Sequence, residues 1–268
     1  MHDAPGARLT DTHAHLSYIL ERSGRAALDA VLDAYSGCVG AAILDPGVDH
    51  DDFPKRKALY GDHPAVRLAA GIWPDADSLR DPDRRLASLE TWVRDPSCMA
   101  VGEAGLDYHW MNGAEEAQAR LLTGQLELAE RRGKPVIVHS REAHAHTLAL
   151  VRSHAAKTPI VIHCFGYDRA AMEEYVAAGC WVSFAGNLTY PGSGHLRDAC
   201  AGVPVGRLLL ETDSPYMNPL PRRGRPSTPL DIGRTYEAAA TLRGVTVEAL
   251  ATRVARNARD VFGPSWGP

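Results

Sequence analysis

The sequence predicts an α/β protein with the architecture of a (β/α)8 TIM barrel, in which eight parallel strands alternate with helices. The chain has 268 residues, which is the usual length of one such barrel. Short apolar runs alternate along it with longer helical patterns, as in a parallel sheet with helical crossovers. Titratable residues recur where the apolar runs end, which is where barrels carry their active sites. We therefore expect residues 1–268 to form a single domain.

Eight apolar or β-branched runs are candidate strands. A strand of a parallel sheet is buried on both faces, so it is a nearly continuous apolar segment rather than an alternating one. The expected strands are RLTDTHAH (8–15), VGAAILD (39–45), VRLAAGI (66–72), CMAVGEAG (98–105), PVIVHS (135–140), PIVIHC (159–164), CWVSFAG (180–186) and RLLLETD (207–213).

Helical candidates separate most of these runs. Several end at Gly or precede Pro, which are common helix stop signals. The expected helices are AALDAVLDAYSG (26–37), RRLASLETWVRD (84–95), EEAQARLLTGQLELAERRG (115–133), AHTLALVRSHAA (145–156), RAAMEEYVAAG (169–179) and DIGRTYEAAATLRG (231–244). Boundaries are least defined between 74 and 97 and in the C-terminal tail. No linker, repeat or low-complexity segment divides the chain.

Composition narrows the class of protein. The chain is 45% apolar and 23% charged, which suits a protein with a sizeable core. It has no apolar run long enough to cross a bilayer and no leader followed by a cleavage site, so we expect a cytoplasmic protein with no membrane partner. No interface pattern is evident, and a monomer is the simplest expectation. The five cysteines are scattered and never form a CxxC pair, which predicts neither disulfides nor a zinc ribbon.

Charge argues against a protein that coats nucleic acid through a basic surface. Lys and Arg number 29 and Asp and Glu number 33, a net charge of −4. One local basic segment is PRRGRP, which contains Arg222, Arg223 and Arg225. It is either a solvated turn or a site for an anionic substrate.

Candidate functional residues lie at the ends of five expected strands. His13 and His15 are separated by one residue, so their side chains point to the same side of a strand. Neutral imidazoles and carboxylates are ligands for divalent metals, and clustering them in a barrel mouth would otherwise be costly. The residues of this expected metal site are His13, His15, Glu103, His139, His163 and Asp213.

The same segments resemble the signatures of the TatD family of metal-dependent hydrolases, which are amidohydrolase-like barrels. The resemblance runs from about residue 9 to 262 and includes the terminal RNARDVFG. The other segments that carry it, in order, are TDTHAHL, VGEAGLDYH, VIVHSREA, VIHCFGY and LLLETDSPY.

The resemblance implies a two-metal centre. In it, His13 and His15 hold one ion, and His139 and His163 hold the other. Glu103 bridges the two ions. Asp213 ligates the first ion and takes a proton from the water between the metals, so that Asp213 and Glu103 are the implied catalytic residues. Carboxylates favour Mg2+ or Mn2+ and four imidazoles favour Zn2+, so the sequence leaves the identity of the two divalent ions open.

Two segments depart from the family pattern. The family's GIHP segment is GIWP here, with Trp73 in place of a histidine, and its Asn-Glu-Pro segment is replaced by RGRPSTP around Arg225. Trp73 is either a core residue or a wall against which a base or an apolar leaving group stacks. These departures leave the implied metal ligands intact and concern the substrate.

Other polar residues have weaker claims. Glu211, Asp107 and Arg141 either orient a ligand or touch substrate, or else form structural ion pairs. Ser183 and Asn187 are candidates to hydrogen-bond substrate. We expect three further histidines on loops or helix surfaces, namely His109, His144 and His146. The chain has no GxSxG motif and no Walker-type loop, which argues against a serine hydrolase or a nucleoside triphosphatase.

The favoured function is divalent-metal-dependent hydrolysis of phosphodiester bonds in DNA, exonucleolytic and acting on single strands or frayed ends. Arginines of the PRRGRP segment could bind backbone phosphates. The alternative enzyme uses the same centre on an amide, ester, lactone or aminoacyl linkage, which Trp73 in place of histidine keeps open. A non-enzymatic scaffold with structural histidines is the third possibility, and it predicts little bound metal.

Overall fold

The computed structural model describes residues 9–36, 41–110 and 114–267 and has an α/β fold. Its sheet has seven parallel strands, hydrogen-bonded in chain order from β1 to β7. The strands are β1 (Ile43–Asp45), β2 (Val66–Ala70), β3 (Cys98–Asp107), β4 (Val136–Arg141), β5 (Ile160–Ile162), β6 (Trp181–Phe184) and β7 (Leu208–Leu210). Apart from a few polar residues in β1, β2, β3, β4 and β6, they consist mostly of buried apolar side chains, as expected for a sheet covered on both faces.

The expected strand at 8–15 is not a regular strand, and the prediction of eight strands was wrong at this point. Arg8 lies outside the described residues. The segment forms only two isolated parallel bridges, from Asp11 to Ile43 beside β1 and from Ala14 to Ser214 after β7. Asp11 explains the irregularity, because its carboxylate accepts hydrogen bonds from the backbone N–H groups of His13 and Thr212 at 3.3 and 3.0 Å. A side chain that binds backbone donors competes with regular ladder pairing.

Residues 10–15 nevertheless lie between the two edge strands. The N–H of Leu44 in β1 donates to the carbonyl of Asp11 at 2.9 Å, and the N–H of Thr12 donates to the carbonyl of Leu210 in β7 at 3.2 Å. Both edges of the curled sheet are therefore hydrogen-bonded to this one segment. It holds His13 and His15 at the centre of the sheet's carboxyl end.

Seven expected strands correspond to β1–β7, with shorter bounds. Residues 39 and 40 of the second expected strand lie outside the described part of the chain. Because β5 ends at Ile162 and β7 at Leu210, His163 and Asp213 lie in the turns that follow these strands. Glu103 and His139 lie within β3 and β4.

The six expected helices are present as α2, α4, α5, α6, α7 and α9. Four more helices were not expected, namely α1, α3, α8 and α10. The bounds are α1 (Leu16–Ser23), α2 (Arg25–Ser36), α3 (Phe53–Tyr60), α4 (Pro82–Val93), α5 (Glu115–Arg132), α6 (His144–Arg152), α7 (Arg169–Ala177), α8 (Gly194–Gly202), α9 (Ile232–Arg243) and α10 (Val247–Phe262), with short 3-10 turns at Gly186–Thr189, Val205–Arg207, Pro229–Asp231 and Pro264–Trp266. The expected stop of α5 is confirmed, since Gly133 adopts a left-handed conformation with φ of 61°.

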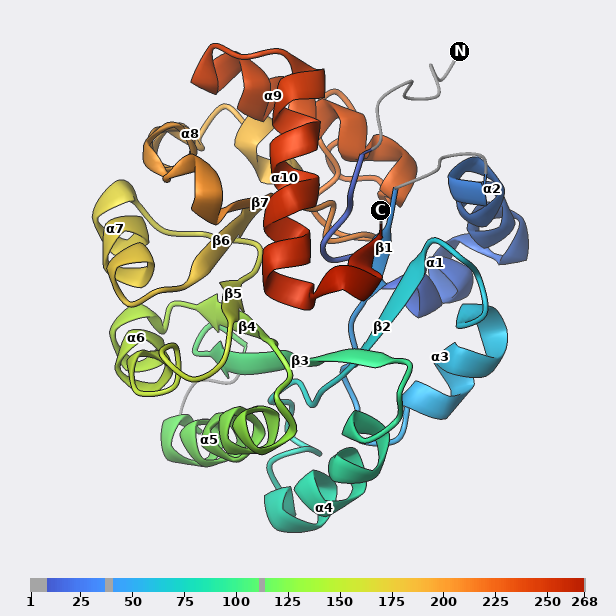
Figure 1. Cartoon of the computed structure of the whole chain (residues 1–268), viewed down its shortest axis with the longest axis vertical. Coiled ribbons are helices and arrows are strands. Elements are labelled where there is room, and N and C mark those ends of the chain that lie inside the picture. The colour runs from blue at the N-terminus through green and yellow to red at the C-terminus, as the bar shows by residue number, and fades with distance from the viewer. Residues whose placement is uncertain (1–8, 37–40, 111–113, 268) are drawn as a thin grey trace.

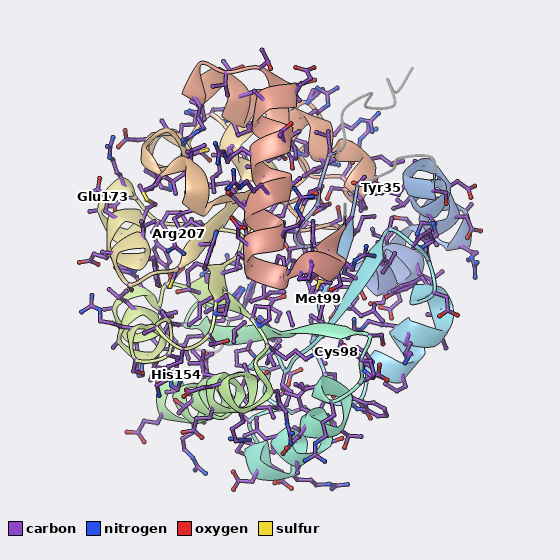
Figure 2. The ribbon with its side chains drawn as sticks, viewed as in Figure 1. Tyr35, Cys98, Met99, His154, Glu173 and Arg207 are labelled. Carbon is purple, nitrogen blue, oxygen red and sulfur yellow. The ribbon has the colours of Figure 1, made fainter. Side chains whose placement is uncertain are left out.

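The helices surround the sheet, and α10 lies across one end of it (Figure 1). Asn257 of α10 donates hydrogen bonds to the carbonyls of Val205 and Leu208, at 2.7 and 2.8 Å, just where β7 begins. Cys98 and Met99, the first residues of β3, lie near the C-terminal end of α10 (Figure 2), where they line one cavity with Val261 and Phe262. Helix α10 therefore covers the end at which the strands begin, and the opposite, carboxyl end carries the candidate functional residues.

Three of the cysteines, Cys98, Cys180 and Cys200, are buried, and Cys164 is partly buried. All four are free thiols, and Cys38 lies outside the described residues. No helix in the described part of the chain is both long and apolar enough to span a membrane.

Candidate metal centre

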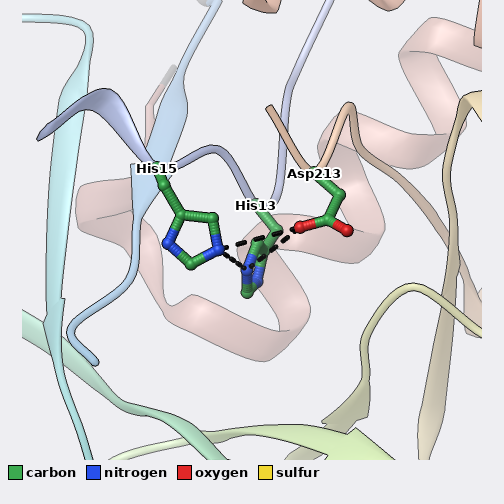
Figure 3. A group of neighbouring side chains, drawn as sticks. All are labelled: His13, His15 and Asp213. Carbon is green, nitrogen blue, oxygen red and sulfur yellow. Dashed lines mark hydrogen bonds and ion pairs between the residues drawn. The ribbon is translucent and has the colours of Figure 1, made fainter. Parts of the chain in front are cut away.

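The first group of candidate ligands is His13, His15 and Asp213, whose side chains point toward one another (Figure 3). The Nε2 atoms of His13 and His15 are 3.2 Å apart. They lie 3.8 and 3.7 Å from Oδ1 of Asp213. All three side chains are buried. The backbone supports this arrangement, since the N–H of Asp213 donates to the carbonyl of His13 at 2.9 Å.

The second group is Glu103, His139 and His163. Nδ1 of His139 and Nε2 of His163 are 3.3 Å apart. They lie 3.0 and 3.1 Å from the same oxygen of Glu103, Oε1. This group therefore draws its members from β3, β4 and the turn after β5.

Glu103 connects the two groups. Its other oxygen, Oε2, lies 3.3 and 3.4 Å from Nε2 of His13 and Nε2 of His15. Each carboxylate oxygen thus faces a different pair of histidines. This is the position that a carboxylate bridging two cations would occupy.

The spacing of these atoms fits bound cations. Two ligand atoms each about 2.0–2.2 Å from one ion, with about 90–130° between the bonds, lie about 2.8–4.0 Å apart. Every separation within the two groups, from 3.0 to 3.8 Å, falls in this range. Imidazole nitrogens and carboxylate oxygens are also suitable donors for a divalent ion. The described residues at this site therefore fit two divalent cations.

Comparison with known proteins agrees with this geometry. The family model of TatD-related DNases matches residues 10–263. The chain belongs to this TatD family. It is 34% identical to the metal-dependent hydrolase YcfH of Escherichia coli K12, over 95% of each chain. It is 37% identical to the 3'-5' ssDNA/RNA exonuclease TatD of Pantoea vagans, over 66% of this chain and 70% of the relative.

A solved structure also places the chain in the TatD family. The crystal structure of the TatD homologue YjjV from Escherichia coli K12 matches with a TM-score of 0.86 and 29% identity, covering 96% of this chain and 98% of that one. The sequence resemblance to the TatD family is thus confirmed. The chain is a metal-dependent hydrolase of that family.

Two carboxylates outside the groups lie beside the histidines of this TatD family member. Oδ2 of Asp107 lies 3.0 Å from Nε2 of His139, and Oε1 of Glu211 lies 3.4 Å from Nδ1 of His163. Each carboxylate thus faces the ring nitrogen that points away from Glu103. A proton held on that nitrogen leaves the other one free to ligate. For Asp107 and Glu211, these contacts favour the orientation of a metal-ligating histidine over substrate binding or a structural ion pair.

Burial and neighbouring charges favour the ligand forms of two groups. Burial lowers the pKa of His15 well below its usual value, and the adjacent His13 adds to this effect, so the ring is neutral. Burial alone would raise the pKa of Glu103, but His163, His13 and His139 outweigh it and hold this pKa well below its usual value. Glu103 is therefore an ionised carboxylate among imidazoles.

Asp213 differs from Glu103. Burial raises its pKa to about 6, with smaller contributions from Glu211 and Glu103 in the same direction. Its backbone is left-handed, with φ of 54°. Such a conformation costs a non-glycine residue about 1–3 kcal/mol and is commonly found at functional sites.

A cavity of about 940 Å3 opens over the two groups. Trp73 and Arg141 line it, as do Ser140, Asn187 and Cys164. The Trp73 ring lies edge-on to His139 at 6.0 Å, so Trp73 is a wall residue of this cavity rather than a core residue. The Arg141 guanidinium lies over Trp110, 5.5 Å from the ring centre. Ser183 is fully buried and bonds to Thr12 instead.

The three arginines of the PRRGRP segment do not line this cavity. Arg222 forms an ion pair with Asp231 at 3.5 Å. Arg223 lies over the ring of Tyr190 at 4.4 Å. Arg225 is exposed. The structure thus separates this segment from the candidate metal ligands.

The three further histidines that the sequence places on loops or helix surfaces lie there. His109 is in the turn after β3 and pairs with Glu142 at 2.7 Å, and His144 and His146 are on α6. Sequence reasoning missed four aromatic residues of the cavity, namely Tyr18, Trp110, Tyr167 and Tyr216. Tyr216 ends the LLLETDSPY segment, and Tyr18 comes three residues after His15. Their closeness in the sequence to candidate metal ligands could have indicated that they line the site.

Proposed function

We propose that this TatD family hydrolase cleaves phosphodiester bonds of DNA, acting as an exonuclease on single strands or frayed ends with two divalent ions, Mg2+, Mn2+ or Zn2+. The observation that carries the proposal is the position of Glu103, whose two oxygens face different histidine pairs. Paired cation sites that share one carboxylate suit the displacement of an oxygen at phosphorus. The name of the Pantoea relative, a 3'-5' ssDNA/RNA exonuclease, supports a nucleic-acid substrate.

The proposed site residues have different roles in metal binding and catalysis. His13, His15 and Asp213 would hold one ion, and His139 and His163 would hold the other. Glu103 would contact both ions. Divalent ions bound there would make a shared water more acidic and offset negative charge on substrate oxygens. Asp213 accepts the proton of the attacking water, since its carboxylate lies within 3.8 Å of both histidines of the first group. Asp107 keeps the ring of His139 in the orientation that faces Glu103.

Arg141 and Trp73 are the proposed substrate-binding residues within the cavity. The Arg141 guanidinium has donors that match phosphate oxygens, and the Trp73 ring offers a surface on which a base can stack. Arg222, Arg223 and Arg225 could act only on parts of a substrate that extend outside the cavity.

The proposal also includes the barrel architecture and the domain organisation of the chain. We infer that the seven strands and residues 10–15 together form a (β/α)8 barrel, and that residues 1–268 form one domain. A cytoplasmic location, the absence of a membrane partner and a monomeric state remain predictions from the sequence.

A second candidate reaction is hydrolysis of an amide, ester, lactone or aminoacyl linkage. The specific observation that favours it is the aromatic lining of the cavity, in which Trp73, Trp110 and Tyr18 offer apolar surface for an uncharged leaving group. The chemistry at Glu103 and Asp213 would be the same. The two candidates differ in substrate and can be separated directly.

The test is digestion of end-labelled single-stranded DNA with added Mg2+ or Mn2+. It compares the wild-type protein with Asp213→Asn, which keeps the shape of the side chain and removes the base. Asp198→Asn, on the exposed surface of α8, is the matched control. We expect stepwise shortening by the wild type and the control, and a rate lower by about 10^2- to 10^4-fold for Asp213→Asn.

Metal content and melting temperature are measured on all three proteins. If the metal-loaded wild type leaves DNA intact but hydrolyses small esters or amides, the nuclease proposal is wrong and the second candidate stands. If the protein binds close to no metal and Asp213→Asn changes no activity, the hydrolytic site itself is wrongly assigned.

A further inference from the structure

The cavity has two unlike sides, and one of them is lined by two tyrosines whose rings contact an exposed arginine. The ring of His15 stacks on Tyr18 at 5.2 Å and meets Tyr216 edge-on at 6.1 Å. Arg22, in the last turn of α1, lies over the Tyr216 ring at 4.7 Å and over the Tyr18 ring at 5.9 Å. We call Tyr18, Tyr216 and Arg22 the tyrosine–arginine rim.

Arg22 is held in place while most of its donors stay unused. One of its Nη atoms donates to the hydroxyl of Tyr216 at 2.9 Å. No carboxylate pairs with this guanidinium among residues 9–36, 41–110 and 114–267, in contrast to Arg25, which pairs with Asp29 at 2.7 Å. A guanidinium has five N–H donors, so four remain for an anion. Because both rings already fix its position, less side-chain entropy is lost when an anion binds.

The basic PRRGRP segment continues from this rim. The N–H of Ser227 donates to the carbonyl of Pro215 at 3.0 Å, and its hydroxyl donates to the carbonyl of Tyr216. The segment is thus attached to the chain that carries Tyr216, and Arg223 lies beside it over Tyr190. Positive charge therefore extends outward from the rim.

The side of the cavity formed after β1 and β2 is different. Its lining includes Asp49 and Asp75 together with Trp73. Asp75 accepts a hydrogen bond from the N–H of Ser78 at 2.7 Å, and Asp49 lies 3.5 Å from Arg85. A phosphate placed there would meet carboxylates, which repel it. An uncharged nucleoside would not be repelled.

We propose that the nucleic-acid strand leaves the cavity over the tyrosine–arginine rim, and that Arg22 binds the first phosphate beyond the one being cleaved. The inference rests on the proposed nuclease function and adds a specific subsite to it. Arg22 contacts the substrate, and Tyr216 is a positioning residue that holds Arg22. The Tyr216 ring lies between the guanidinium and His15, 4.7 Å from the first and 6.1 Å from the second.

The experiment compares two substrates that differ in phosphates beyond the cleaved bond. A single-stranded 12-mer has them, and a dinucleoside monophosphate has only the bond to be cleaved. Values of kcat and KM are measured for the wild type, Arg22→Gln, Tyr216→Phe and the control Arg25→Gln. The control removes an exposed arginine from the neighbouring helix α2.

Arg22→Gln should lower kcat/KM on the 12-mer by about 5-fold or more, mainly through KM, because one phosphate contact is lost. Its effect on the dinucleoside monophosphate should be less than half as large. Between 50 and 200 mM salt, the wild type should lose about 2.6-fold more activity on the 12-mer than Arg22→Gln, since each phosphate contact to a single strand adds about 0.7 to the salt slope. Tyr216→Phe should lower both kcat/KM on the 12-mer and its salt dependence, by less than Arg22→Gln does.

Equal losses on both substrates, an unchanged salt slope, or the same loss in Arg25→Gln would overturn the inference while leaving the nuclease function intact. If the metal-loaded wild type cleaves neither substrate, the proposed function fails, and the rim subsite fails with it. Melting temperatures of all four proteins identify any variant that loses activity through unfolding.

Discussion

Nε2 of His139 and Oδ2 of Asp107 lie 3.0 Å apart, at hydrogen-bonding distance, on the side of the imidazole ring that faces away from Glu103. The other ring nitrogen, Nδ1, lies 3.0 Å from Oε1 of Glu103. With its proton on Nε2, shared with Asp107, the ring offers a lone pair at Nδ1. Asp107 therefore sets which nitrogen of His139 can ligate a cation.

Asp107→Ala is expected to weaken metal binding or activity by about 10- to 100-fold, the usual effect of removing a carboxylate that orients a metal-ligating histidine. Asp107→Asn keeps an oxygen acceptor and should lose less. Metal affinity is measured by competition with a chromophoric chelator, alongside the rate of hydrolysis. Glu116→Ala, which removes an exposed carboxylate at the start of α5, is the control. An Asp107→Ala protein that binds metal as tightly as the wild type would contradict this role.

The sequence indicated that the candidate ligands lie close together, because strand ends of a parallel sheet converge at one edge. His13, Glu103, His139 and their partners follow apolar runs, and that position alone indicates a shared site. The irregular pairing of residues 10–15 was not predictable in the same way. It depends on the Asp11 carboxylate meeting the N–H of Thr212, about two hundred residues away in the chain.

Candidate substrate-binding residues are harder to predict from sequence, since their roles depend on which other groups they meet. The sequence gives no partner for Arg222, but in the structure Arg222 forms an ion pair with Asp231. Arg22 gave no signal, because α1 has only eight residues and its apolar pattern is too short to recognise. Its position between two tyrosine rings appears only once the turn after β7 is folded beside α1.

Asp95 should make stability depend on pH in acid. Burial alone would raise its pKa, but Lys57, 2.8 Å away, and the donors of Ser97 outweigh burial and lower the pKa to about 2. Because the pKa is lower in the folded chain, the contact stabilises the protein above about pH 4 and is lost as the pH falls toward 2. The pair is partly exposed and screened by solvent, so we expect about 1 kcal/mol or less.

Urea unfolding of the wild type and Asp95→Asn between pH 2 and 7 measures this contribution. The variant should be less stable at pH 7, and the difference should vanish near pH 2. Asp62→Asn, an exposed residue of the turn after α3, provides the comparison. A stability difference that stays constant across this range would mean that Asp95 acts by packing rather than by charge.

Gly105 of β3 pairs with His139 of β4, and the two backbones approach so closely that a Cβ atom at this glycine would lie 2.0 Å from the carbonyl oxygen of His139. Gly105→Ala must therefore push β3 and β4 apart, which should destabilise the fold by about 1–3 kcal/mol and move His139 away from Glu103. Urea unfolding and bound-metal content measure the two effects. Gly206→Ala meets nothing within 4 Å and should change stability by less than about 0.5 kcal/mol. If Gly105→Ala kept both wild-type stability and metal content, close strand approach would not be what fixes His139.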